Sequence, residues 1–215
     1  MRMNHVYFEV LGGATLRPHE DYGMLLKSYQ ADPPEPRTNF VTIEGRDGDV
    51  DFSDWTGVIR FDSREVHVSL RDMQGNADTL IAIINGRRVK VWFDDEPRWY
   101  YTGRVTGIQT NRFTRHHVTD IDITVTCEPY RLSFIPSRIE KTLTNEEQEV
   151  MVVPKRMPTL LTVTVDGTCE YDVDGIERSY DTSGTHIDTF PITGPTTVTI
   201  TGSGTAEFVW TDGDF

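Results

Sequence analysis

Residues 120–127, DIDITVTC, determine the predicted fold class of this chain. Ile121, Ile123, Val125 and Cys127 alternate with polar Asp and Thr residues. Because successive side chains of a β-strand point to opposite faces, this pattern predicts a strand with one packed face and one face in water. The same alternation recurs in residues 66–70, 89–93, 162–165, 197–201 and 206–210. The chain is therefore predicted to be mainly β.

One segment has the spacing of a helix instead. Within residues 77–84, apolar side chains recur at i, i+3, i+4 and i+7, which predicts one short helix with its apolar stripe on the flanking strands. Asn76 is expected to cap the start of this helix, because Asn is a preferred N-cap residue. Asn85 and Gly86 are expected to end it in a left-handed conformation.

The chain is long enough for two modest domains, and we expect residues 1–135 and residues 136–215 to form them. Pro129 and Pro136 interrupt strand pairing around the expected junction. A charged, helix-permissive stretch, residues 138–149, follows before strands resume near residue 160. The second domain is predicted to be a compact all-β sandwich.

Composition excludes several classes of protein. A formal net charge of −13 argues against general nucleic-acid binding and against anionic membrane surfaces, since both require clustered Lys and Arg. No apolar run approaches the roughly 20 residues that span a bilayer. The first residues lack a signal-peptide core, so we expect the chain to be made and folded in a cytoplasm. Cys127 and Cys169 are expected to pack inside strands of different domains rather than form a disulfide.

Three acidic or histidine-containing clusters invite a metal-binding or acid–base interpretation. Residues 94–96, DDE, precede a proline and are better explained as a hairpin turn, since neighbouring strand residues point apart. Asp47, Asp49 and Asp51 resemble the start of a calcium loop, but the Glu required at its twelfth position is missing, so an acidic turn is the better account.

The histidines are the third group. His116 and His117 follow a predicted polar loop over residues 110–115, and His19 lies near Asp21. A zinc site needs three or four converging ligands, and the two cysteines form no close pair. We therefore expect solvated histidines in loops.

No pattern of residues indicates catalysis. The chain lacks a Gly-x-Ser-x-Gly elbow, a P-loop and a dinucleotide fingerprint, and Ser203 lies in a predicted turn. We assign no catalytic, cofactor-binding or metal-binding residue. A set of aromatic residues is expected either to pack in the core or to form a subunit interface, where aromatic side chains are enriched: Trp92, Trp99, Tyr100 and Tyr101.

An ordered set of short sequence motifs in turns and strands resembles the N-terminal domain of the distal tail proteins of bacteriophages with long, non-contractile tails. The resemblance covers roughly residues 20–130. Its motifs are DYG at 21–23, GRDGDVD at 45–51, NGR at 85–87, FDDEP at 93–97, YYTGRV at 100–105 and CEPY at 127–130. Residues 157–160, leading into a Thr/Val strand and Asp166-Gly167, are similar to the start of the galectin-like C-terminal domain of that family, and residues 208–215 correspond to its final strand.

The resemblance implies a structural virion protein rather than an enzyme, with no cofactor. It implies a homohexameric ring at the tail tip, assembled in the host bacterial cytoplasm. Such a ring joins the tail tube protein to the baseplate or to tail-tip proteins, serves as an attachment point for receptor-binding proteins, and lets the tape measure protein and then DNA pass. No membrane is involved.

Two other functions remain open from the residues alone. A carbohydrate-binding module for host adhesion could use Trp210, Trp99 and tyrosines to stack on sugars. A hydrolase could use a pair of carboxylates that converge only in the fold.

Overall fold

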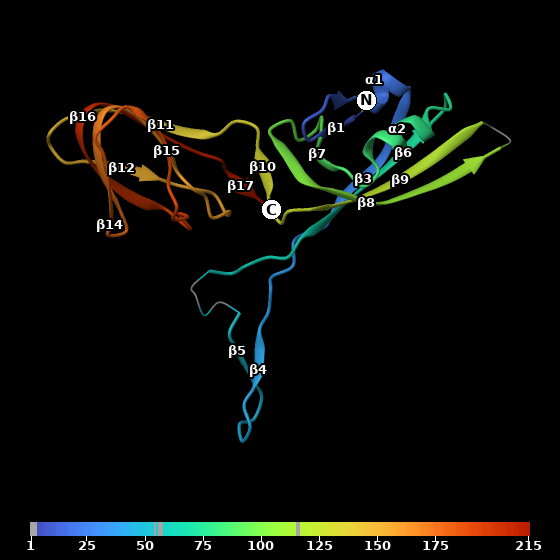
Figure 1. Ribbon diagram of the computed structural model, residues 1–215. Coiled ribbons are helices and arrows are strands. Elements are labelled where there is room, and N and C mark those ends of the chain that lie inside the picture. The colour runs from blue at the N-terminus through green and yellow to red at the C-terminus, as the bar shows by residue number, and fades with distance from the viewer. Residues whose placement is uncertain (1–3, 54, 56–57, 115–116) are drawn as a thin grey trace. The chain divides into compact units, whose positions relative to one another are not determined.

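The structure is a computed structural model that describes residues 4–53, 55, 58–114 and 117–215. The chain divides into two compact units (Figure 1). The first unit comprises residues up to Arg131 together with Phe215, and the second comprises residues 132–214. The division lies four residues before the end of the predicted first domain, 1–135. The prediction of a mainly β fold is confirmed.

The first unit is built on an antiparallel sheet. The order of its strands is β2 (Thr15–Leu16), β1 (Val6–Val10), β7 (Arg88–Phe93), β8 (Trp99–Phe113), β9 (Val118–Cys127), β6 (Arg64–Asp72) and β3 (Met24–Ala31). A separate hairpin, β4 (Phe40–Thr42) and β5 (Asp49–Asp51), is inserted between β3 and β6.

Strand alternation builds the core of the first unit. Val66, Val68 and Leu70 of β6 are buried, and each lies opposite a buried apolar residue of β9. The intervening residues of β6 face the other side of the sheet. The alternation predicted for residues 66–70 and 120–127 is therefore confirmed.

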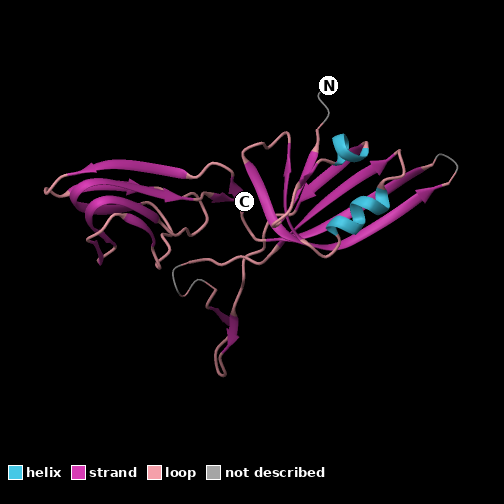
Figure 2. Cartoon of the chain, turned by 45° about the horizontal axis from the view of Figure 1, so that its top comes forward, coloured by secondary structure: helices cyan, strands magenta, loops and turns pink. Residues whose placement is uncertain are grey.

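The predicted helix is α2 (Ala77–Ile84), and it lies against the sheet of the first unit (Figure 2). Ala77, Leu80 and Ile84 are buried in the same core cluster as β6 and β9. Gly86 has φ of +68°, which confirms the left-handed end of the helix. A second helix, α1 (Pro18–Tyr22), was not predicted, because a single turn is too short to show periodicity.

The predicted cap of α2 is wrong. The Asn76 side chain makes no cap hydrogen bond and donates instead to the carbonyl of Tyr22. The carboxylate of Asp72, at the end of β6, accepts hydrogen bonds from the backbone N–H groups of residues 74, 75 and 77 at 2.6–3.0 Å. Asp72 therefore satisfies the turn that carries the chain from β6 into the helix.

The second unit has six strands in one continuous sheet: β11 (Ser137–Leu143), β12 (Gln148–Val152), β13 (Thr162–Val173), β14 (Ile176–Tyr180), β15 (Gly184–Ile187) and β16 (Thr196–Trp210). Two short strands, β10 (Arg131–Ser133) and β17 (Gly213–Asp214), pair with each other. The long strands β13 and β16 pair over their whole shared length. Their first and second halves take different outer partners, so the sheet folds over a single apolar core (Figure 2).

Glycines allow the two long strands to approach closely where their partners change. Gly202 and Gly204 have φ of +143° and +98°, a backbone conformation that disfavours other residues. A Cβ atom at Gly204 would lie 1.9 Å from the carbonyl oxygen of Asp166 on β13. These positions therefore require glycine.

The prediction of a helix-permissive stretch over residues 138–149 is wrong, because most of it belongs to β11 and the start of β12. Ile139 lies opposite the fully buried Phe208 of β16. Tertiary pairing with β16 overrides the local preference of the charged residues, which stay largely exposed.

Asp120 links three strands on the outer face of the first sheet. Its carboxylate, only 9% exposed, accepts two hydrogen bonds from the Arg71 guanidinium at 2.7 and 2.9 Å and one from Lys27 at 2.7 Å. The bonds from Arg71, with the Lys27 ammonium, hold the pKa of Asp120 well below its usual value.

We expect Asp120→Asn to lower the free energy of unfolding by about 1–2 kcal/mol near neutral pH, because the paired cations stay partly exposed to water. The folded-state pKa lies below the unfolded value of 3.8, so the contribution is complete above that value and disappears as pH falls toward the folded pKa. Urea unfolding near neutral pH and at about pH 3 should therefore show a smaller gap between wild type and variant in acid.

Asp78→Asn provides the control, because Asp78 pairs with Arg112 at an exposed position. It should change stability by less than about 0.5 kcal/mol. An equal loss in both variants, or a gap that persists in acid, would contradict this account of Asp120.

Candidate functional site

The most exposed apolar surface of the first unit lies on its inserted hairpin. We call residues 32–63, which connect β3 to β6 and carry β4 and β5, the arm. Among the described residues of the arm, only Pro34 is buried. Large apolar side chains face water along it: Phe40, Val41, Ile43, Trp55 and Ile59. Trp55 is 80% exposed and Phe40 is 58% exposed.

Backbone hydrogen bonds join the two limbs of the arm. The N–H of Arg37 donates to the carbonyl of Arg60, and the N–H of Asp62 donates to that of Glu35, each at 2.8 Å. Nearer the hairpin, the N–H of Phe52 donates to Asn39 at 2.8 Å. The arm is thus an ordered ribbon with exposed apolar side chains, which is a feature of binding surfaces.

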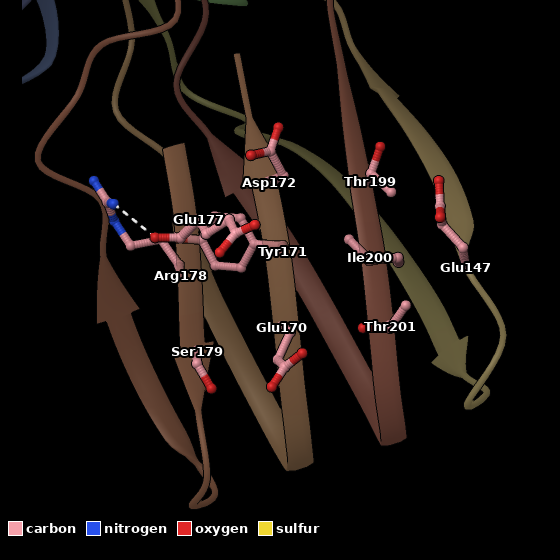
Figure 3. A pocket seen from close by; sticks show the side chains of 10 residues that line it. All are labelled: Glu147, Glu170, Tyr171, Asp172, Glu177, Arg178, Ser179, Thr199, Ile200 and Thr201. Carbon is pink, nitrogen blue, oxygen red and sulfur yellow. Dashed lines mark hydrogen bonds between the residues drawn. The ribbon is translucent and has the colours of Figure 1, made fainter. Parts of the chain in front are cut away.

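The second unit has a hollow of about 450 Å³ on the outer face of β13, β14 and β16 (Figure 3). Glu170 and Asp172 point outward from β13, beside Glu177 of β14, and Glu147 lies across the hollow. The remaining polar lining consists of the hydroxyl groups of Ser179, Thr199 and Thr201 and one cation, Arg178, set against four carboxylates. The hollow is therefore acidic, and its lining offers no exposed aromatic ring for stacking.

Tyr171 lines the same hollow but is only 2% exposed, because it points to the inner side of β13. Its hydroxyl donates to Asp188 at 3.1 Å. Burial, followed by its hydrogen bonds, raises the pKa of Tyr171 far above its ordinary value. A tyrosine in this state is a packing residue and offers no acid–base chemistry near neutral pH.

The aromatic residues proposed for sugar stacking are largely engaged. Trp210 is 6% exposed, and its indole N–H donates to Asp212 at 3.2 Å. The ring of Trp99 lies 5.0 Å from the guanidinium carbon of Arg131. The hypothesis that Trp210 stacks on a sugar is therefore wrong, because its ring belongs to the core of the second unit.

The aromatic residues expected either to pack in the core or to form a subunit interface, residues 92 and 99–101, differ in their burial. Tyr101 is buried in the core of the first unit, which agrees with the first of these two expectations. Trp92 stacks on Tyr7 with ring centroids 5.4 Å apart, and the ring of Tyr100 lies 5.4 Å from the ammonium of Lys90. Trp92, Trp99 and Tyr100 remain half-buried.

Residues 94–96 form the turn between β7 and β8, as predicted. Their three carboxylates have separate partners. Asp94 accepts hydrogen bonds from His5 and Tyr7, Asp95 from Tyr29, and Glu96 from Arg131. They do not converge on one point.

The acidic residues 47, 49 and 51 lie in the turn and second strand of the arm hairpin. Asp49 accepts a hydrogen bond from Thr42, and Asp51 accepts hydrogen bonds from the hydroxyl and backbone N–H of Ser53. The bonds from Ser53 lower the pKa of Asp51. The interpretation as an acidic turn fits this arrangement.

The predicted loop histidines have mixed outcomes. His19 lies in α1 rather than a loop, and its ring stacks on His5 with centroids 4.4 Å apart. The nearby Asp21 instead accepts a hydrogen bond from the backbone N–H of Arg17. His117 is exposed, whereas His116 lies outside the described residues.

The polar loop predicted for residues 110–115 is wrong over residues 110–113, which end β8. These residues pair with the start of β9, so the hairpin ladder overrides their polarity.

The two cysteines are buried and free, one in each unit, as predicted. Burial raises the pKa of Cys127 to about 12 and also raises that of Cys169. Neither thiol is therefore activated as a nucleophile.

One converging group was missed by the sequence analysis. Among the described residues, Asp32, Glu65 and His67 place one ligand atom each within 4.8 Å of one another. Glu65 and His67 share a face of β6 because they are two residues apart. Asp32 joins them only through the pairing of β3 with β6, which the sequence does not reveal.

Comparisons with known proteins show what this fold is similar to. No protein-family model and no curated protein sequence matches the chain. The crystal structure of SPP1 Dit, described as a paradigm of the hub adsorption apparatus in phages that infect Gram-positive bacteria, matches over 100% of both chains with a TM-score of 0.70 and 13% identity. A de novo designed double-stranded β-helix covers 37% of this chain and 99% of its own at 16% identity, and its TM-score of 0.26 is too low to carry an argument.

The likeness to SPP1 Dit confirms, at the level of the fold, the resemblance to distal tail proteins that was inferred from short sequence motifs. Neither helix in the described part of the chain is long and apolar enough to cross a membrane.

We expect Trp210→Ala to lower the free energy of unfolding by about 3–5 kcal/mol, because it removes a large buried ring from the core of the second unit. Ile187→Ala is the matched control, since Ile187 belongs to the same unit, is 67% exposed and should contribute little. Urea unfolding followed by circular dichroism measures both. Equal stability of the two variants would show that Trp210 is not a core residue.

Proposed function

We propose that this chain is a structural tail protein of a bacteriophage with a long tail, acting as a distal tail hub at the tail tip. The observation that carries the proposal is the likeness to SPP1 Dit over the whole of both chains. The match spans both units of this chain. By the same likeness, the chain acts by assembly rather than by catalysis.

The proposed assembly is a homohexameric ring. A cyclic ring requires two different surfaces on each copy that fit one another head to tail. The exposed apolar side chains of the arm supply a candidate for one of these surfaces, because burying Phe40, Ile43 and Trp55 against a neighbour removes apolar area from water. The edge strands β2 and β3 offer unpaired backbone groups as further contact sites.

The charge of the chain suits passage of DNA through such a ring. Six copies carry a formal charge of −78, six times −13. If part of this charge lines the channel, it repels DNA phosphates and keeps the genome from binding to the wall. The ring would join the tail tube protein on one side to tail-tip proteins on the other, with the tape measure protein passing first and receptor-binding proteins attached outside.

We expect the purified chain to form hexamers of about 147 kDa, six times 24.5 kDa, when its mass is measured by light scattering after size-exclusion chromatography. The double substitution Phe40→Ser and Trp55→Ser should shift the protein toward lower mass while leaving its circular dichroism unchanged, because both side chains lie outside the core. A strictly monomeric wild type at high concentration would contradict the proposal.

Ile187→Ser is the control for this experiment. Ile187 is 67% exposed and belongs to the second unit, away from the arm in sequence and unit. The control should keep the wild-type mass. If it dissociates the assembly as much as the arm variant does, the arm is not the specific contact surface.

A further inference from the structure

We propose that Asp32, Glu65 and His67 bind a Zn²⁺ ion at the base of the arm. The three residues lie where the chain leaves β3 and where it returns into β6. The N–H of Asp32 donates to the carbonyl of Glu65 at 2.9 Å, so the backbone itself fixes the two ends of the arm against each other. The donor atoms are Asp32 Oδ2, Glu65 Oε2 and His67 Nε2.

The two distances from His67 Nε2 fit a metal ion better than they fit direct hydrogen bonds. His67 Nε2 lies 3.5 Å from Asp32 Oδ2 and 3.4 Å from Glu65 Oε2. Both exceed the 2.7–2.9 Å typical of a charge-assisted N–H···O bond. The pair formed by His5 and Asp94 in the same unit shows the ordinary distance, 2.7 Å.

A tetrahedral zinc ion fits the two distances from His67 Nε2, while the two carboxylate oxygens lie within 4.8 Å of each other. With bonds of about 2.0–2.1 Å, its ligand atoms lie about 3.3–3.4 Å apart. A magnesium ion, with octahedral bonds of similar length, brings neighbouring ligands to about 2.9 Å and prefers oxygen donors. Calcium also prefers oxygen donors, so the imidazole selects against both ions.

Groups outside the set orient its members. The Gln30 amide donates to Asp32 Oδ1 at 2.7 Å, which leaves Oδ2 for the ion. The other ring nitrogen of His67, Nδ1, lies 3.3 Å from the hydroxyl of Thr124 on β9. When Nδ1 carries the proton and donates to Thr124, the lone pair of Nε2 is available, as in zinc sites whose histidines are held by a second partner.

The site is open to solvent on one side. His67 is 43% exposed in its side chain, and a hollow of about 320 Å³ lined by Gln30, His67 and Thr124 lies beside it. Three protein ligands leave the fourth tetrahedral position to water or to a ligand from a partner. The ion would clip the two limbs of the arm together at their base, so this inference concerns the chain itself and does not depend on the proposed hub function.

Zinc titration of the untagged full-length chain by isothermal calorimetry tests the proposal. We expect one saturable site per chain, lost in His67→Ala and weakened about tenfold in Thr124→Val. His5→Ala is the matched control, because His5 forms an ordinary pair with Asp94, and it should leave the zinc site intact.

Substitution with Co²⁺ gives a second readout. A tetrahedral Co²⁺ ion absorbs strongly in the visible range, whereas an octahedral one absorbs weakly, so wild type should show the strong bands and His67→Ala should lose them. Absence of saturable zinc binding by wild type, or equal binding by His67→Ala, would overturn the proposal. Circular dichroism should confirm that both histidine variants keep the wild-type fold.

Discussion

The register of β6 is the constraint on which the rest of the first unit depends. Its inward residues pair with those of β9 and form the core beneath α2. Its outward residues supply Arg71 to Asp120 and place Glu65 beside His67. Its last residue, Asp72, organises the turn into α2. Because the side-chain period of a strand is two, a slip of one residue would turn every one of these groups to the wrong face.

Alternation of apolar and polar residues predicted the strands correctly because it reports burial on one face directly. It predicted β6, β7, β9 and the start of β13, and helical spacing predicted α2. The turn predicted around Ser203 is wrong, because residues 197–201 and 206–210 belong to one continuous strand, β16. Alternation failed for β11 and β12, where charged residues hide strands whose stability comes from pairing with β16. It also failed for the end of β8, which is polar but held by β9.

The candidate sites were less predictable, since each depends on residues far apart in sequence. The cap of α2 comes from Asp72 rather than from the adjacent Asn76, a choice made by the path of the turn. The convergence of Asp32 with His67 requires the β3–β6 pairing. Trp210 was a candidate for sugar binding until its burial placed it in the core. A sequence shows which residues are aromatic or acidic, and only the fold shows which of them reach solvent.

The exposed surfaces of the chain favour a role in assembly over a role in catalysis. The arm exposes apolar side chains that a single chain leaves uncovered, the hollow of the second unit is acidic without an exposed ring, and both thiols are buried. The hub function proposed above would explain this combination, because the exposed apolar side chains of the arm would then meet other copies of the chain.

Electron microscopy of the purified, negatively stained protein tests this account most directly. The proposed hub function predicts ring-shaped particles with sixfold symmetry and a central opening. Particles that remain single two-unit chains at every concentration would contradict it.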